Sequence, residues 1–304
     1  MASILQTALE LGLISSLTVL SLFLSYTMLN VCDLSTDGCF TLGAAVGAVV
    51  AISGHPFLSL PAAMCAGMIS GFVTAILQTK MGIDSLLSGI IVNTGLYSIN
   101  IAVMGGASLL NMNKTVTVFS MMKELLRFSA LGSLYKTVIA LIAVAAVIVF
   151  LTLFLRTKLG LAIRATGNNP AMVRSSSVNP AFTTIVGLCI SNSFTALSGC
   201  LLAQSQKSVN IDIGSGIVTI SLASLLIGRA FAGKGGITRR AIGAVLGAII
   251  FRLVYAIALR FHMPAFMLKL VSSLIVIAAI SGPYLKSRYP EFHRRLTHSR
   301  SKGE

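Results

Sequence analysis

The chain has 304 residues, of which 55% are hydrophobic and only 10% are charged, and its mean hydropathy is +0.91. Soluble domains carry about a quarter charged residues, so this composition excludes a soluble protein. The formal net charge of +15 does not indicate nucleic-acid binding. Lys and Arg lie at the ends of apolar segments and in the tail, as in membrane proteins, rather than on one exposed face. The composition therefore predicts an all-α polytopic membrane protein.

Apolar stretches of about twenty residues recur along the chain, and a helix of that length crosses a hydrocarbon core of about 30 Å. They predict about nine transmembrane or half-spanning helices. The nine run over Ala8–Asn30, Phe40–Ile52, Phe57–Leu77, Ser85–Met104, Tyr135–Leu155, Ala181–Leu202, Ile217–Phe231, Ala241–Leu259 and Ala265–Ile280. Together they predict one membrane domain over residues 1–284, followed by a basic tail over residues 285–304.

Three basic regions predict the orientation of these spans: the loop around Gly160, the segment Arg229–Arg240 and the C-terminal tail. Two spans separate each region from the next, so all three are expected on the same side, which the positive-inside rule identifies as the cytoplasm. Counting back through nine spans places the N-terminus outside. The external loop before Tyr135 then holds Met121–Phe128, which is typical of an amphipathic helix lying at the membrane surface.

Two short spans follow polar segments that lipid does not tolerate. Residues 30–38 precede the span Phe40–Ile52, and residues 212–216 precede Ile217–Phe231. Irregular polar backbone at membrane depth must be buried in protein or line a cavity, and interrupted spans point to a transport pathway. The predicted topology places the two segments on opposite faces of the membrane, as an inverted repeat would.

Glycines spaced four residues apart predict close helix packing in three of the spans. The pairs are Gly43 and Gly47, Gly67 and Gly71, and Gly243 and Gly247. Residues four apart share one helix face, where glycine lets a neighbouring backbone approach. Packing within one subunit is the favoured interpretation, with a dimer seam as the alternative.

Catalytic, metal and nucleotide sites find no support in the sequence. Gly228–Gly235 is similar to a phosphate-binding loop but has Gly235 where that loop requires Ser or Thr. The cysteines and aspartates between residues 32 and 39 lack a nearby histidine and match no common zinc spacing. No nucleophile and base, or acid and base, are placed as a pair. We therefore expect no catalytic residue, no metal and no cofactor.

Polar side chains within the spans are almost all neutral. Few ionisable groups lie at membrane depth, which argues against a proton- or sodium-driven carrier. Neutral groups can join helices by hydrogen bonds, which is the ordinary role of each one alone. As a set they are candidates to line the path of a small polar or zwitterionic solute. The candidates are Asp33, Asn93, Asn100, Ser191, Asn192 and Thr195.

The loop over residues 156–180 combines glycines, cations and helix-start signals between two long spans. Asn168 or Asn169 is placed to cap a short helix that begins at Pro170. Arg164 and Arg174 offer donors to acidic or carbonyl groups of a partner, and anchoring of the topology is the alternative role for each.

The segment from Gly160 to Arg174 resembles the cytoplasmic coupling segment of ABC-importer permeases of the branched-chain amino acid and ribose type. Those segments read approximately Gly-x-Ala-hydrophobic-Arg-Ala-x-Gly-Asn-Asn. This chain departs at Ser177, where glycine is usual before the hydrophobic-Asn pair. Leu29–Ala44 is similar to a segment of the tryptophan/tyrosine permease subgroup, and Gly216–Gly228 is a third match.

This resemblance implies that residues 1–284 form a permease domain in the bacterial inner membrane. It implies two ATP-binding subunits docked on the coupling loop, an extracytoplasmic solute-binding protein, and a second permease subunit, expected to be another copy of this chain. This chain would not itself hydrolyse ATP. The residues implied in coupling are Gly160, Arg164, Ala165, Gly167, Asn168, Asn169 and Arg174.

The solute is not specified by these motifs. The subgroup resemblance implies an amino acid, with aromatic ones favoured over branched-chain amino acids, sugars or nucleosides. A stand-alone channel or facilitator, or a secondary carrier, is the alternative function. It would need the same spans but would leave the loop over residues 156–180 without a role.

Overall fold

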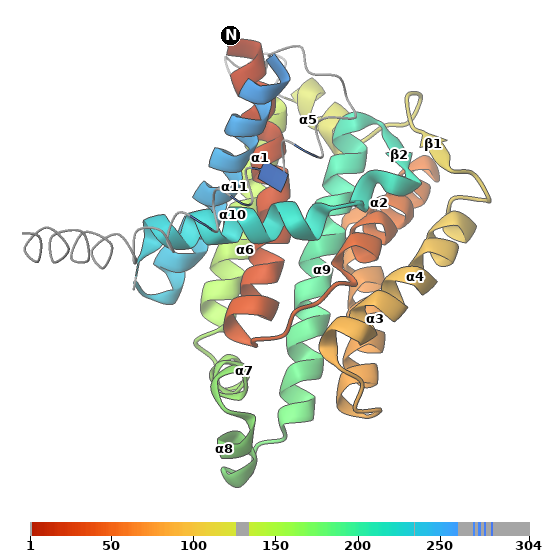
Figure 1. The fold of residues 1–304 in the computed structure, drawn as a ribbon. Helices are drawn as coiled ribbons and strands as arrows, with labels where there is room; N and C mark the ends of the chain where they lie inside the picture. The colour runs from red at the N-terminus through yellow and green to blue at the C-terminus, as the bar shows by residue number, and fades with distance from the viewer. Residues whose placement is uncertain are drawn as a thin grey trace, which may run out of the picture.

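The computed structural model describes residues 2–125, 134–233 and 235–260, together with residues 270, 273, 274, 277 and 281. Helices dominate this part of the chain (Figure 1). The first half contains α1 (Ala2–Leu22), the π-helix η1 (Phe23–Met28), α2 (Thr36–Ile52), α3 (Ser59–Thr79), α4 (Ser85–Val103), β1 (Leu109–Asn111) and α5 (Val118–Leu125). The second half contains α6 (Tyr135–Phe154), α7 (Lys158–Asn168), α8 (Pro170–Ser175), α9 (Pro180–Gln206), β2 (Ser208–Asn210), the 3-10 helix η3 (Ile211–Gly214), α10 (Ile217–Ala232) and α11 (Ile237–Arg260).

The predicted class is confirmed. Seven of the described helices are long and apolar enough to cross a membrane, and α2 is a shorter apolar helix of 17 residues. The first eight predicted spans each coincide with one of these helices. The second of them begins at Thr36, four residues earlier than predicted, because the polar Thr36 and Asp37 already belong to the helix. The ninth, Ala265–Ile280, falls largely outside the described residues, as does the basic tail.

Helix α9 is the central element of the bundle. It packs against α3, α2 and α1, and it runs the length of the molecule in Figure 1. Of its most apolar window 72% is buried, against 28% for α6 on the periphery. A helix surrounded by neighbours needs side chains that suit protein on every face. Small and hydroxyl residues fill this role, among them Ser191, Thr195 and Ser198.

Glycines set the spacing of the helices around α9, as the four-residue pairs predicted. A Cβ atom on Gly43 would overlap the backbone of Ala196, and one on Gly71 would overlap the carbonyl of Leu188. Gly247 lies equally close to the backbone of Ser224 in α10. All three contacts lie within this chain, which confirms the packing interpretation of the glycine pairs.

A two-stranded ribbon was not predicted from the sequence. β1 and β2 pair antiparallel, with Leu110 opposite Val209. They join the segment after α4 to the end of α9, about a hundred residues apart, so no local pattern signals the pairing. The neighbouring α5 confirms the predicted amphipathic helix but starts three residues earlier, at Val118, and the predicted end at Phe128 lies outside the described residues.

The close contact at Gly43 predicts a specific loss of stability. Gly43→Ala should lower the free energy of unfolding by about 1–3 kcal/mol, because the added methyl group overlaps main-chain atoms that cannot move away. Gly95→Ala is the matched control, since no atom lies within 4 Å of a Cβ built there. The control should be neutral or slightly stabilising. Thermal unfolding of both variants in detergent, followed by circular dichroism, measures the difference, and equal melting curves would contradict the packing assignment.

Candidate functional site

Two interrupted helices meet inside the bundle. After η1 the chain turns at Asn30, which has a positive φ of 57°, and returns towards the interior before α2 begins. After α9 it turns at Lys207, with φ 54°, and passes through β2 and η3 to Gly216 and α10. Figure 1 shows the two segments arriving from opposite ends of the bundle, as the sequence predicted. The sequence did not predict that they touch. The inverted repeat itself stays a prediction.

Asp33 holds the first of these segments in place. Its Oδ1 accepts hydrogen bonds from the backbone N–H and the hydroxyl of Ser35, at 2.8 and 2.6 Å. Its Oδ2 accepts one from Nδ2 of Asn192 in α9, at 2.8 Å. The residue is only 1% exposed. A buried carboxylate needs such donors, and with three of them Asp33 fastens the start of α2 to the central helix.

Asp37 joins the two interrupted helices directly. Its Oδ2 accepts the backbone N–H of Gly216 at 3.0 Å, and its Oδ1 accepts that of Val218 at 2.8 Å. These N–H groups belong to the first turn of α10, which has no side-chain cap of its own. A carboxylate at a helix N-terminus satisfies free donors and complements the helix dipole. Asp37 in α2 therefore caps α10 from a distant part of the chain.

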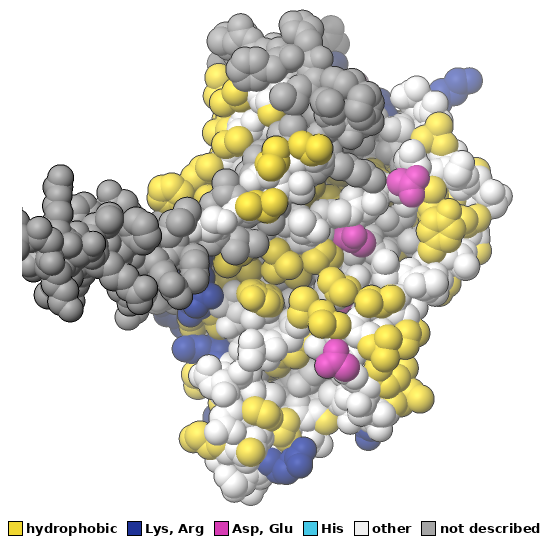
Figure 2. Space-filling model, viewed as in Figure 1, with side chains coloured by type: hydrophobic (Ala, Val, Ile, Leu, Met, Phe, Trp, Pro, Cys, Tyr) yellow, Lys and Arg dark blue, Asp and Glu magenta, His cyan; other side chains and the backbone are white. Residues whose placement is uncertain are grey.

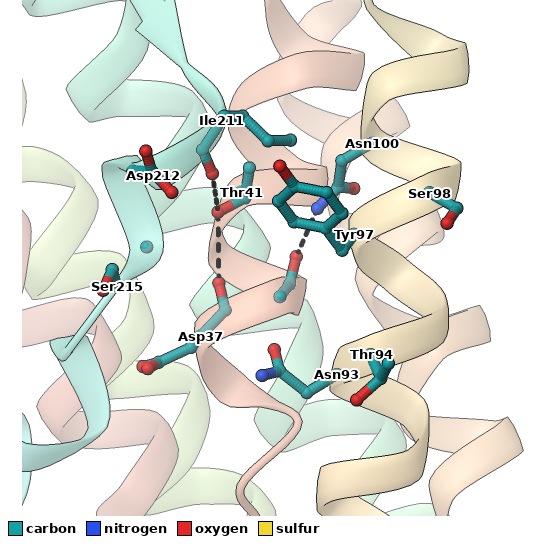
Figure 3. A pocket seen from close by; sticks show the side chains of 12 residues that line it. Asp37, Thr41, Asn93, Thr94, Tyr97, Ser98, Asn100, Ile211, Asp212 and Ser215 are labelled. Carbon is teal, nitrogen blue, oxygen red and sulfur yellow. Dashed lines mark hydrogen bonds between the residues drawn. The ribbon is translucent and has the colours of Figure 1, made fainter. Parts of the chain in front are cut away.

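A cavity of about 430 Å³ lies beside this junction (Figure 3). One wall is α4, another is the start of α2, and the third is the η3 segment. Gly214 lets η3 approach α2, since a Cβ there would overlap the Asp37 carbonyl. The hydroxyl of Thr41 donates to the carbonyls of Asp37 at 3.2 Å and Ile211 at 3.5 Å. The lining residues are Asp37, Gly38, Thr41, Asn93, Thr94, Tyr97, Ser98, Asn100, Ile211, Asp212, Gly214 and Ser215.

The structure separates the six predicted path residues into two groups. Asn93 and Asn100 line the cavity. The other four are buried in helix contacts: Asp33 and Asn192 bond each other, and the hydroxyls of Ser191 and Thr195 meet that of Ser21 in α1, at 2.8 and 2.7 Å. For Ser191 and Thr195 the ordinary role, joining helices, is the one that the structure displays.

The sequence reasoning missed Asp37, Tyr97 and Asp212 as lining residues. A signal for Tyr97 was present, because Asn93, Tyr97 and Asn100 recur at intervals of four and three residues and so share one face of α4. The contribution of Asp37 and Asp212 depends on the meeting of two segments far apart in the chain, which no local pattern reveals.

The segment over residues 156–180 folds into two short helices at the opposite end of the molecule from β1 and β2 (Figure 1). The side-chain hydroxyl of Thr157 accepts the N–H of Gly160 and starts α7. The side chain of Asn169 accepts the N–H groups of Ala171 and Met172, both at 3.1 Å, and starts α8 at Pro170. The predicted capping is thus confirmed for Asn169, while Asn168 is the last residue of α7.

Helix α7 is seated firmly on the bundle. A Cβ on Gly167 would overlap the carbonyl of Met28 at the end of η1, so glycine is needed for this contact. The hydroxyls of Thr166 and Thr183 are 2.8 Å apart and join α7 to α9. Ile163 of α7 is fully buried where α7 packs against α9. Helix α7 is therefore in direct contact with both η1 and α9.

The outer surface of α7 and α8 is exposed and basic. Ala165, Asn168 and Arg174 are exposed, and Met172 is 66% exposed. Arg164 lies near enough to Arg240 for their charges to repel, and Arg229 joins them. The end of α10 and the start of α11 therefore approach α7, while the common membrane side of the basic regions stays a prediction. In Figure 2, acidic side chains lie in the middle of the face drawn, with basic ones towards its edges.

Comparison with known proteins identifies the family. A family model described as "Branched-chain amino acid transport system / permease component" matches residues 4–280. The chain belongs to this family. The permease is 33% identical over 271 residues to the tyrosine transport system permease protein of Clostridioides difficile (strain R20291), across 89% of this chain and 88% of that protein.

Two further relatives extend the comparison. An uncharacterized protein of Rickettsia prowazekii (strain Madrid E) is 32% identical over 229 residues, which cover 75% of the permease and 77% of that protein. The galactose/methyl galactoside import permease protein MglC of Escherichia coli (strain K12) is 31% identical over 192 residues, covering 62% and 54%. No solved structure matches the chain.

As a permease component of the ABC-importer family, the chain is a multi-pass membrane protein and a transport subunit, not an enzyme.

The cap between α2 and α10 predicts a local effect of substitution. Asp37→Ala should speed amide hydrogen exchange over residues 216–220 and cost about 0.5–2 kcal/mol, because those N–H groups lose their acceptor. Asp84→Ala is the matched control, since Asp84 caps α4 through Leu86 at an exposed helix end. Exchange measured by mass spectrometry should show faster α10 exchange in the first variant only. An unchanged α10 in Asp37→Ala would refute the capping role.

The two neighbouring asparagines predict opposite outcomes. Asn169→Ala should loosen α8 by about 1 kcal/mol, because the N–H groups of its first turn lose their acceptor. Asn168→Ala should have little effect, since that side chain caps no helix. Limited proteolysis within residues 169–179 measures the difference. Equal cleavage rates in the two variants would contradict the assignment of Asn169 as the cap.

Proposed function

We propose that the permease is the membrane-spanning subunit of an ATP-driven importer of a small solute in a bacterial inner membrane. An amino acid is the favoured solute, and an aromatic one before others. The support is the tyrosine permease relative, which aligns over 88% of its own length, whereas the galactose permease relative aligns over 54%. The single observation that carries the proposal is the capped, exposed helix pair α7–α8 held against the transport bundle.

In this proposal α7 and α8 dock on an ATP-binding subunit. The residues facing outward combine apolar, amide and basic groups, as an interface that meets acidic and carbonyl groups requires. The coupling residues are Gly160, Arg164, Ala165, Gly167, Asn168, Asn169 and Arg174. Gly160 and Gly167 act by allowing close backbone contacts, and Arg164 and Arg174 act by donating hydrogen bonds.

The proposed orientation in the membrane is based on the basic residues near α7 and α8. In this orientation the end that carries α7 and α8 faces the cytoplasm, together with the basic segment over residues 229–240 and the C-terminus, in keeping with the positive-inside rule. The N-terminus, β1, β2 and α5 face outside, where an extracytoplasmic binding protein delivers the solute. Two ATP-binding subunits and a second copy of this chain complete the assembly.

The proposed coupling path runs through contacts that the bundle contains. ATP-driven movement of the partner displaces α7, which pushes η1 through Gly167 and α9 through the Thr166–Thr183 contact. The end of η1 leads directly to the segment held by Asp33, and α9 carries Asn192, the partner of Asp33. The cavity beside Asp37 therefore lies at the far end of an unbroken series of contacts.

Reconstitution tests this function against a stand-alone facilitator. The permease with its co-purified partners is placed in liposomes. Uptake of labelled tyrosine is then followed with and without ATP inside the liposomes, and with and without binding protein outside them. Uptake that requires both supports the importer. Uptake by the permease alone, without ATP, would establish a facilitator instead.

Reversal of charge on α7 and α8 predicts loss of the ATPase partner. The double substitution Arg164→Glu and Arg174→Glu should reduce recovery of the ATP-binding subunit at least roughly tenfold in affinity purification, because two charged hydrogen bonds turn into repulsion. Lys80→Glu, at the exposed end of α3, reverses a single positive charge away from the helix pair. It should leave recovery unchanged. Equal recovery from the double variant would place the docking surface elsewhere.

A further inference from the structure

The cavity beside Asp37 has a marked charge imbalance. Two carboxylates, those of Asp37 and Asp212, line it, and its lining holds no Lys, Arg or His among the residues that the structure describes. Asp37 is engaged by the N-terminus of α10. Asp212 is exposed, and its carboxylate has no hydrogen bond or ion pair with any described residue. One carboxylate at the cavity is therefore free of partners within the described protein.

Asn100 supplies an independent observation that points to a ligand. The residue is 2% exposed, and its Nδ2 donates to the carbonyl of Gly38 at 3.1 Å. This bond settles which end of the amide is nitrogen, because a carbonyl accepts only from a donor. Oδ1 is left buried without a hydrogen-bond partner. An unsatisfied buried acceptor costs about 1–3 kcal/mol. A ligand that donates a hydrogen bond to Oδ1 would recover part of this cost.

Besides Asn100, the polar side chains of α4 at the cavity have no hydrogen-bond partner among the described residues, except Thr94, whose hydroxyl donates to the carbonyl of Ile90 at 2.9 Å. The amide of Asn93 and the hydroxyl of Tyr97 form no hydrogen bond with the described residues, and the ring of Tyr97 is 51% exposed. Figure 3 shows Tyr97 and Asn93 one turn apart along α4, with Asp212 on the opposite wall of the cavity. Tyr97 precedes Asn100 by three residues, so the two side chains lie on the same face of α4.

We propose that this cavity binds the solute through a protonated amine, with Asp212 as the counter-charge and Asn100 Oδ1 as an acceptor. The ring of Tyr97 provides a flat apolar surface for a planar group of the solute. A primary ammonium suits the carboxylate of Asp212, since it carries a positive charge and three donors. A neutral sugar would leave the Asp212 charge uncompensated, and an anion would be repelled by it. This inference rests on the proposed transport function and names the solute group that its site selects.

Direct binding to the purified full-length chain tests the inference without the ATPase. Tritiated tyramine, which has the amine and the aromatic ring but no carboxylate, is the probe, and 3-(4-hydroxyphenyl)propionate, which has the carboxylate but no amine, is the competitor. Saturable tyramine binding is expected, with no competition by the carboxylate analogue. Asp212→Asn should weaken tyramine binding at least roughly tenfold, because a charged hydrogen bond is lost.

Two controls separate recognition from folding. Asp84→Asn removes an exposed carboxylate outside the cavity and should bind tyramine like the unaltered chain. Asp212→Asn should melt at the same temperature as the unaltered chain, because its side chain contacts no described partner. Tyr97→Ala, a second variant in the wall, removes the proposed ring surface and should also weaken tyramine binding while leaving the melting temperature unchanged.

Three outcomes would overturn the inference: no saturable tyramine binding, equal binding of the carboxylate analogue, or unchanged affinity in Asp212→Asn. Its failure is distinguishable from failure of the proposed function. ATP-dependent tyrosine uptake that persists undiminished in Asp212→Asn would retain the importer and discard the amine site. Amine binding together with uptake that needs no ATP would retain the site and discard the importer.

Discussion

The structure depends on the satisfaction of main-chain polar groups where helices are interrupted inside an apolar bundle. Lipid offers no hydrogen bonds, so each N–H and C=O there must find a partner within the protein. Two carboxylates meet this demand. Asp33 holds the chain that leads into α2, and Asp37 caps α10. These acceptors satisfy N–H groups where the two interrupted segments meet, and so stabilise two walls of the cavity.

The central helix α9 connects this junction to the exposed helix pair at the other end. Near its start it meets α7 through Thr183, and further along it meets Asp33 through Asn192. Glycines in α2 and α3 bring those helices into main-chain contact with α9, so it has little room to move independently. In the proposed mechanism a displacement of α7 would therefore move α9 as a rigid unit. This gives the proposed coupling a physical route.

The candidate sites were predictable to different degrees. The cap at Asn169 follows from an Asn-Pro pair at a helix start, a local signal that tertiary structure has no reason to override. Asn93 and Asn100 were recognised as polar residues at membrane depth, and both line the cavity. Ser191 and Thr195 carried the same signal but bond to Ser21. Polarity within a span does not distinguish a helix contact from a cavity wall, because both need hydrogen-bonding side chains.

By itself the sequence determined the membrane class, eight helices of the bundle and the helix pair at residues 156–180, because hydrophobic length and capping are local properties. Tertiary structure decided the rest. The β1–β2 ribbon, the capping of α10 by Asp37 and the presence of Asp212 and Asn93 in one cavity lining join segments about one hundred to one hundred and eighty residues apart. Such contacts arise from how the helices pack around α9, and packing depends on the whole set of surfaces rather than on any one stretch of residues.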